Sequence, residues 1–217
     1  DHRDLHSFPT RRSSDLARLE QEIKTGQLNK KYTLAIFLDF SKAFDMVWHN
    51  GLISKLQNKG LSGNIINYIQ DFLRDRQITV GVENLFSEEY HLENGTPQGS
   101  ILSPTLFNIV VDDLFDGVSP KVNTSKFADD GALWVRCNNL PTATKLLQSA
   151  LNNVDQWADK WGFKLNADKT TGVAFKHHSK PSIHPNLYLK NQKINFSKQA
   201  KFLELIFDEN LTWGAHV

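Results

Sequence analysis

A continuous apolar run, Tyr32–Leu38 (YTLAIFL), constrains the fold of this chain more than any other feature. The run has the length of a strand rather than of a helix, and it does not alternate apolar with polar residues. Such a run is typical of a strand that is buried on both faces, so other elements must cover each side of its sheet. The run ends at Asp39, and the sequence therefore predicts a carboxylate at the end of a central strand.

The rest of the chain mixes helical patterns with short strand patterns. Apolar periodicity predicts helices at residues 16–23, 50–58, 62–73, 103–115 and 142–161. Strands are predicted at residues 78–82, 86–92, 122–128, 132–136, 171–175, 187–189, 193–195 and 201–207. Because helices interrupt the strands without strict alternation, an α+β fold fits better than a doubly wound sheet.

Cysteine content and hydropathy exclude several classes of protein. The only cysteine, Cys137, allows no intrachain disulfide, and we expect no disulfide-linked partner. Without metal-type cysteine pairs or a signal core, the chain is expected to be intracellular, with nucleus and cytoplasm both open. No run of about 18 apolar residues occurs, so no membrane span or membrane partner is expected.

Charge is distributed unevenly, although the net charge is only +1. The stretch from Lys160 to Lys201 has nine lysines and one acid, whereas residues 83–116 have seven acids and no Lys or Arg. A basic C-terminal third can follow a phosphate backbone. A solvated, lysine-rich face explains the same composition, so charge alone leaves both interpretations open.

The first sixteen residues are interpreted separately from the rest. Residues 7–16 (SFPTRRSSDL) have no apolar period and resemble the translation of a common sequencing adapter. We therefore expect residues 1–16 to be an artefact or a disordered arm, without regular structure, and the folded domain to occupy residues 17–217.

Carboxylates placed at predicted strand ends indicate the chemistry. Asp39 ends the central strand, and Asp129 and Asp130 occupy a tight strand–turn–strand. Three converging carboxylates repel one another unless cations lie between them, and hard oxygen ligands suit Mg²⁺. Helix capping and ordinary turn chemistry are the alternatives for each aspartate taken alone. Asp112-Asp113, by contrast, follows an apolar run inside a predicted helix and is expected to be solvated surface.

A glycine-containing loop, residues 95–100 (GTPQGS), precedes a predicted helix. Its glycines permit close approach of backbone to a ligand, and its amides can meet a phosphate or a base. The loop lacks the Lys-Ser/Thr of a P-loop, so by itself it is weak support for a nucleotide site.

Five motifs in order identify a family. They are LAIFLDFSKAFD (34–45), GTPQGSILSPTLFN (95–108), FADD (127–130), WGFKLNADKT (161–170) and KFLELIFDENLTW (201–213). The series resembles the palm of reverse transcriptases, most closely those of jockey-type retrotransposons without long terminal repeats. The resemblance covers about residues 17–217. It implies a right-hand polymerase palm, an antiparallel sheet with packed helices, with partial fingers and the thumb missing.

The resemblance implies catalytic roles for four side chains. Asp39, Asp129 and Asp130 match the aspartates that hold two Mg²⁺ ions, with Mn²⁺ as an alternative. The backbone carbonyl of Phe40 would complete one metal shell. Lys169 matches the lysine that protonates the leaving pyrophosphate, and an ordinary surface lysine is the alternative.

Contacts to the nucleotide and to the primer are implied in the same way. Phe44 matches the steric gate beneath the sugar, although a core aromatic would be the same residue type. Gln98 and Gly99 match the loop that contacts the incoming nucleotide and the template base. The primer grip would comprise Phe202, Leu203, Glu204 and Leu205. Family members usually have glycine where Glu204 stands, and an acidic side chain there is unfavourable near a DNA backbone.

These motifs imply an RNA-directed DNA polymerase fragment that uses an RNA template, a DNA primer and deoxynucleoside triphosphates. The alternative is an inactive retroelement remnant with at most weak nucleic-acid binding. A metal phosphohydrolase of the Asp-x-Asp type is excluded because Ser41 occupies the second Asp position. The fragment is expected to be inactive alone.

Overall fold

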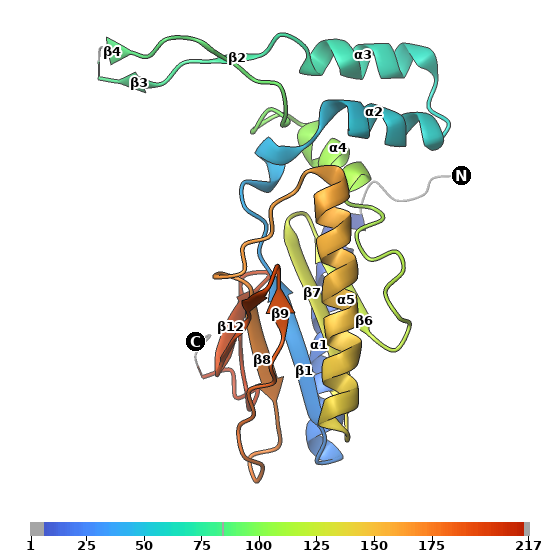
Figure 1. The fold of residues 1–217 in the computed structure, drawn as a ribbon, viewed down its shortest axis with the longest axis vertical. Coiled ribbons are helices and arrows are strands. Elements are labelled where there is room, and N and C mark those ends of the chain that lie inside the picture. The colour runs from blue at the N-terminus through green and yellow to red at the C-terminus, as the bar shows by residue number, and fades with distance from the viewer. Residues whose placement is uncertain (1–6, 84, 215–217) are drawn as a thin grey trace. The chain divides into compact units, whose positions relative to one another are not determined.

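The computed structural model describes residues 7–83 and 85–214 and has an α+β fold (Figure 1). The chain forms two compact units, each assembled from separate stretches of sequence. The sheet unit comprises Asp1–Phe40, Phe115–Gln156 and Leu165–Val217. The helical unit comprises Ser41–Leu114 and Trp157–Lys164.

A five-stranded sheet forms the centre of the sheet unit. In spatial order its strands are β11 (Asn195–Ser197), β8 (Thr171–Phe175), β1 (Tyr32–Leu38), β7 (Asp130–Cys137) and β6 (Asn123–Phe127). All neighbours pair antiparallel except β11, which pairs parallel with β8. The prediction of an antiparallel sheet is therefore wrong at this edge, and the sheet is mixed.

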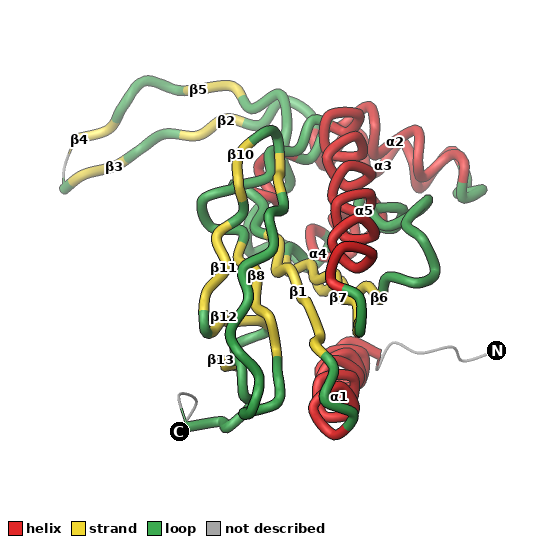
Figure 2. The backbone as a smooth tube through the Cα atoms, turned by 60° about the horizontal axis from the view of Figure 1, so that its bottom comes forward, coloured by secondary structure: helices red, strands yellow, loops and turns green. Residues whose placement is uncertain are grey.

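The central position of β1 follows from its continuous apolar sequence. Leu34, Ala35 and Ile36 have no exposed surface, as expected of a strand covered on both faces. The helix α1 (Ser7–Leu28) lies against one face of the sheet and α5 (Leu140–Trp161) runs along the other (Figures 1 and 2). The predicted central strand and the long helix near residues 142–161 are thus confirmed.

The helix α1 extends well beyond its predicted limits at both ends. It begins at Ser7, so the expectation that residues 1–16 lack regular structure is wrong for residues 7–16, while residues 1–6 lie outside the described residues. The Asp15 carboxylate accepts a hydrogen bond from Ser125 Oγ at 2.9 Å, and Leu16 packs against the core. The sequence analysis did not predict the N-terminal extension because the apolar periodicity of this helix begins only at Leu16. Helix formation does not test the adapter origin, which stays a prediction.

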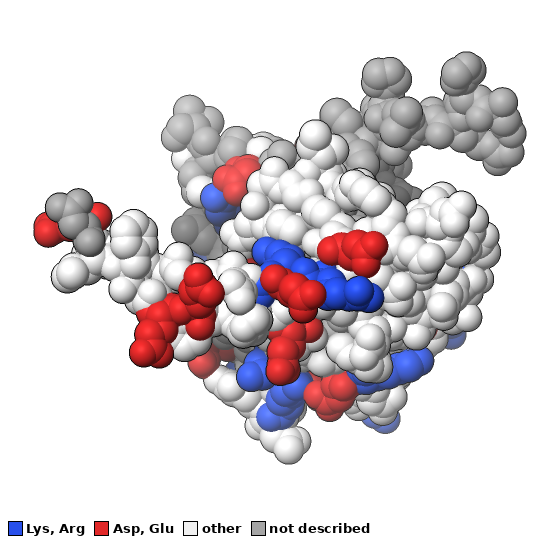
Figure 3. Space-filling model, turned by 90° about the horizontal axis from the view of Figure 1, so that it is seen from above, with Lys and Arg blue, Asp and Glu red and all other residues white. Residues whose placement is uncertain are grey.

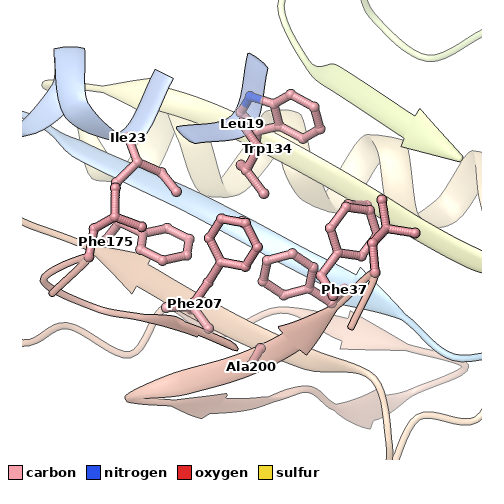
Figure 4. Close-up of a cluster of buried hydrophobic side chains, with 13 residues drawn as sticks. Leu19, Ile23, Phe37, Trp134, Phe175, Ala200 and Phe207 are labelled. Atoms are coloured by element: carbon pink, nitrogen blue, oxygen red, sulfur yellow. The ribbon is translucent and has the colours of Figure 1, made fainter. Parts of the chain in front are cut away.

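Aromatic side chains fill the core between α1, the sheet and a C-terminal hairpin (Figure 4). That hairpin consists of β12 (Gln199–Phe202) and β13 (Leu205–Asp208), and a smaller one consists of β9 (Tyr188–Leu189) and β10 (Gln192–Lys193). The Phe37 ring centroid lies 5.2 Å from that of Phe202 and 6.4 Å from that of Phe207. The core therefore connects the central strand to the C-terminal hairpin.

Short elements build the helical unit. Its helices are η1 (Ala43–Met46), α2 (His49–Asn58), α3 (Gly63–Leu73) and α4 (Ser103–Val110), and its strands are β2 (Gln77–Ile78), β3 (Gly81–Val82), β4 (Leu85–Phe86) and β5 (Tyr90–His91). The helix α4 ends at Val110, earlier than predicted. Asp112-Asp113 therefore lies in the following turn rather than inside a helix, which corrects the expectation.

The four short strands pair as a hairpin arm within residues 76–92, and these pairings confirm the hairpin predicted from the sequence. Its large apolar side chains are exposed, including Leu85 and Phe86. Acidic side chains gather along the same arm, at the left of Figure 3. No helix within the described ranges is long and apolar enough to cross a membrane.

Candidate active site

Strand pairing brings the three predicted aspartates to one end of the sheet. The β1–β7 ladder ends with Leu38 opposite Gly131, so Asp39 and Asp130 are the next residues beyond it. The β6–β7 pairing places Phe127 opposite Asp130, which leaves Ala128-Asp129 as a two-residue turn. Asp130 therefore lies in β7, two residues before the predicted start of that strand, rather than in the predicted turn. Ala128 has a φ of 50°, the left-handed conformation that such turns require. The sequence prediction that these carboxylates share a sheet end is consistent with this register.

Electrostatics indicate that Asp39, Asp129 and Lys169 are neighbours. Partial burial of Asp39 raises the pKa of its carboxyl above the usual range. The Lys169 ammonium lowers this pKa in part, and the negative charge of Asp129 raises it further. Asp129, Asp130 and Lys169 are themselves exposed to solvent. The positive charge of Lys169 therefore offsets only part of the cost of ionising Asp39 at the end of the strand, and we call this carboxylate under-compensated.

Hydrogen bonds from backbone N–H groups hold the segment that carries Lys169 against Asp39. The Asp39 N–H donates to Thr170 Oγ1 at 3.2 Å, and the Asn166 N–H donates to the Asp39 carbonyl at 2.9 Å. The Lys169 N–H donates to Asn166 Oδ1 at 3.2 Å, which closes a turn beneath the lysine. Phe40 forms an isolated antiparallel bridge with Leu165 in the same region. These contacts hold the backbone on both sides of Asp39.

The donor chemistry fits a hard divalent cation, because carboxylate oxygens are hard ligands and the negative charge of Asp129 lies close enough to Asp39 to raise the pKa of the Asp39 carboxyl. Within residues 7–83 and 85–214, however, no three His, Cys, Asp or Glu side chains are gathered as a ready metal-ligand group. Asp130 follows Asp129 directly in the chain, at the first position of β7.

The helical unit contains the residues assigned to nucleotide contact. Phe44, in η1, is partly buried and stacks on Phe107 with ring centroids 4.5 Å apart. The Gly95–Ser100 loop packs on η1, because the Thr96 N–H donates to the Phe44 carbonyl at 2.9 Å. Gln98 and Gly99 are exposed at the tip of this loop, and Gly99 has a φ of 87°. The loop thus presents both predicted residues to solvent.

The proposed primer grip forms the turn of the β12–β13 hairpin. Phe202 and Leu203 are buried in the core, Leu205 is half-buried, and Glu204 is exposed. Leu203 and Glu204 both have positive φ, 49° and 66°. The departure from glycine at Glu204 therefore coincides with a backbone conformation that favours glycine.

A buried lysine in the helical unit was missed by the sequence analysis. The Lys55 ammonium donates to the Val110 carbonyl and to Asp113, and it lies 3.9 Å from the Trp161 ring centroid. Burial lowers the pKa of Lys55, an effect that Asp113 opposes. Asp112 pairs with Lys59 at 2.6 Å. Asp112-Asp113 is therefore ion-paired rather than simply solvated, a partnership that sequence spacing does not reveal.

Carboxylates and a lysine at the end of a central strand, in a mixed α+β fold, define a candidate phosphoryl-transfer site. The family model described as "Reverse transcriptase (RNA-dependent DNA polymerase)" matches residues 1–206. The chain belongs to the reverse transcriptase family and is similar to the polymerases of jockey-type retrotransposons, which confirms the resemblance inferred from its motifs. The match includes residues 1–16, the segment interpreted as an adapter.

Two relatives from Drosophila melanogaster illustrate the similarity. The chain is 32% identical to the probable RNA-directed DNA polymerase from transposon BS, over 92% of this chain and 23% of the relative. It is 30% identical to the RNA-directed DNA polymerase from mobile element jockey, over 87% of this chain and 21% of the relative. The chain therefore spans about a fifth to a quarter of the length of these relatives.

Solved structures support the fold. Apo telomerase from Candida Tropicalis, truncated from its C-terminal domain, aligns with a TM-score of 0.61 at 17% identity, covering 92% of this chain and 39% of the telomerase. Telomerase from the same organism in complex with a fragment of telomeric RNA aligns with a TM-score of 0.60 at 15% identity, covering 92% and 32%. At this level of identity the similarity concerns the fold alone.

Proposed function

We propose that this protein is the palm of an RNA-directed DNA polymerase, with part of the fingers, from a retrotransposon. The reaction joins a primer 3′-hydroxyl to the α-phosphate of a deoxynucleoside triphosphate, and pyrophosphate leaves. The observation that carries the proposal is the under-compensated Asp39 carboxylate, placed with Asp129 and Lys169 at the end of the central strand.

The sheet unit would supply the acid–base and metal-binding groups. Asp39, Asp129 and Asp130, with the Phe40 carbonyl, would hold two Mg²⁺ or Mn²⁺ ions. When bound, such ions activate an attacking hydroxyl and stabilise the leaving oxygen. The Lys169 ammonium, exposed beside Asp39, would give a proton to the pyrophosphate.

The helical unit would supply nucleotide selection. The Phe44 ring cannot retreat easily because it stacks on Phe107, so it would exclude a 2′-hydroxyl from the space above it. Gln98 and Gly99 would contact the incoming nucleotide and the template base. In the sheet unit, the turn from Phe202 to Leu205 would contact the primer, with Glu204 as its exposed side chain.

Primer extension on an RNA template with Mg²⁺ tests this proposal. Because the chain spans about a fifth of the jockey polymerase, it is assayed alone and also grafted in place of the matching segment. We expect the chimera to extend the primer and the chain alone to do so little. Aligning the hydroxyl with the triphosphate contributes roughly 7–11 kcal/mol, and this alignment needs parts that hold both substrates.

Matched aspartate variants separate catalysis from folding. Asp129→Ala in the chimera removes a metal ligand and should abolish extension, whereas Asp112→Ala removes an exposed acid paired with Lys59 and should preserve it. Equal extension by both variants would refute the role of Asp129. A folded, template-binding chimera that extends nothing would favour the inactive-remnant alternative.

A further inference from the structure

The loop that carries Gln98 is attached to the segment following Asp39 by four contacts within the helical unit. The Gly95 N–H donates to the Val47 carbonyl at 2.8 Å, and the Thr96 N–H donates to the Phe44 carbonyl at 2.9 Å. His49 Nε2 lies 2.7 Å from the Gly95 carbonyl, and Gln98 Nε2 lies 3.1 Å from Asp45 Oδ1. Two backbone hydrogen bonds and the His49 side chain thus fix the base of the loop, while the Asp45 side chain contacts Gln98 further along it.

Close packing makes the base of this loop intolerant of side chains. Gly95 has a φ of 89°, and a Cβ added there would lie 2.9 Å from Asp45 Cα and from the Asp45 carbonyl oxygen. The backbone of Asp45 therefore defines where the loop can begin. The carboxylate of the same Asp45 then contacts the side chain of Gln98, three residues after Gly95.

The contact between Gln98 and Asp45 has a chemical direction. An ionised carboxylate only accepts hydrogen bonds, so the Gln98 amide must turn its NH₂ toward Asp45. The carbonyl oxygen of Gln98 is then the end of the amide that a ligand can meet. A carbonyl oxygen accepts hydrogen bonds, so a ligand group that pairs with it must be a donor.

We propose that Asp45 is a positioning residue that fixes the orientation of the Gln98 amide, so that Gln98 presents a hydrogen-bond acceptor to its ligand. His49 supports this arrangement by donating from Nε2 to the Gly95 carbonyl, because a carbonyl oxygen only accepts hydrogen bonds. On the proposed function, on which the identity of the ligand rests, the donor is the 3′-hydroxyl of the incoming deoxynucleotide. The sugar of a deoxynucleoside triphosphate has no other hydroxyl.

An asparagine at position 45 distinguishes this role from simple support of the loop. Asp45→Asn keeps the size of the side chain, but an amide both donates and accepts. Gln98 can then pair with Asn in either orientation and presents its oxygen only part of the time. A purely structural Asp45 would be replaced by Asn without effect on ligand selection.

The first experiment needs no nucleotide and uses the chain itself. In NMR spectra, the Gln98 side-chain NH₂ resonances should move toward their free positions in Asp45→Ala, with little change at the Gly95 and Thr96 amides. His49→Ala should instead speed hydrogen exchange at those two amides. Asp71→Ala, which removes an exposed acid 3.6 Å from Arg74 in the same unit, is the control and should change neither. Unchanged Gln98 resonances in Asp45→Ala would overturn the proposal.

The second experiment measures nucleotide selection in the presence of Mg²⁺. Fluorescent binding assays on the chimera with the jockey polymerase compare a deoxynucleoside triphosphate with its 3′-deoxy analogue, which lacks the donor. We expect the wild type to prefer the hydroxyl-bearing nucleotide about tenfold, a ratio worth about 1.4 kcal/mol. The preference should fall toward one in Asp45→Asn and in Gln98→Ala, with no further loss in the double variant.

The two experiments fail in distinguishable ways. Additive losses in the double variant would show that Asp45 does not act through Gln98, which overturns the proposal. An undiminished preference in Asp45→Asn would do the same. If the chain shows the NMR coupling but the chimera binds no nucleotide, the result would instead count against the proposed function, because the Asp45–Gln98 pair is then intact without its ligand.

Discussion

Replacing Glu204 with glycine should stabilise this protein, although Glu204 forms an ion pair. Glu204 occupies the second position of the two-residue turn between β12 and β13, and its φ is 66°. A side chain in this left-handed region costs about 1–2 kcal/mol, because Cβ approaches the following carbonyl oxygen. Glycine removes that cost but loses roughly 0.5–1 kcal/mol more backbone entropy on folding.

The exposed ion pair between Lys201 and Glu204 offsets part of this gain. Lys201 Nζ lies 2.6 Å from Glu204 Oε2, but the side chains are 60% and 73% exposed, so the pair contributes about 0–1 kcal/mol. We expect Glu204→Gly to raise the free energy of unfolding by about 0.5 kcal/mol. For a chain of this size, the melting temperature should then rise by roughly 1–2 °C.

Glu204→Ala is the matched control, because it removes the same ion pair and keeps the Cβ. Thermal melts are measured at low and at high salt. At low salt, the melting temperature should be highest for the glycine variant, intermediate for the wild type and lowest for the alanine variant. At high salt, where the ion pair is screened, the alanine variant should approach the wild type. An alanine variant as stable as the glycine variant would refute the backbone explanation and implicate the negative charge of Glu204 instead.

Three further predictions concern the site and its supports. Burial and a neighbouring negative charge raise the pKa of Asp39, so the free energy of unfolding should fall as the pH rises from 3.8 through the raised value. The Asp39→Asn variant should therefore have a higher melting temperature than the wild type at pH 7 in EDTA. This difference in melting temperature should vanish below pH 3.8. Lys55→Met should lower the free energy of unfolding by about 1–3 kcal/mol in urea titrations, because it leaves the half-buried Asp113 carboxylate without its cation. Lys59→Met removes an exposed ion pair with Asp112 and should cost under about 1 kcal/mol. Equal costs for the two variants would contradict this assignment. Gly172→Ala should lower the free energy of unfolding by about 1–3 kcal/mol, since its Cβ would lie 2.7 Å from the buried Phe196 ring of β11. Gly63→Ala is the control, because its Cβ meets nothing within 4 Å, and it should be neutral or stabilising. A neutral Gly172→Ala would show that the Phe196 ring moves aside.

Local sequence patterns predicted the elements whose surroundings are uniform. The run from Tyr32 to Leu38 is apolar throughout because both faces of β1 are covered, so its central place could be read directly. Asp39 could be predicted as a site residue because it directly follows that apolar run, so that its place at the strand end is visible in the sequence. The turn at Asp129 was equally local, because two residues close the β6–β7 hairpin.

Features that depend on distant partners could not be predicted in this way. The parallel pairing of β11 is set by where the chain returns to β8, which no local period encodes. Lys55 reads as a surface lysine within an amphipathic helix, yet Asp113 and two tryptophans enclose it. Asp45 lies inside a recognised motif, but its bond to Gln98 joins segments 53 residues apart.

The central position of β1 has a consequence for how the chain is made. Synthesis proceeds from the N-terminus, so the most apolar strand of the sheet emerges well before either of its neighbours. β7 begins only at Asp130 and β8 only at Thr171, and both edges of β1 lack their partners until then. Such non-local pairing slows folding and leaves a strand edge open to other chains. The nascent polypeptide should therefore depend on chaperones until β8 has left the ribosome, and yields of soluble protein should rise when translation is slowed at low temperature.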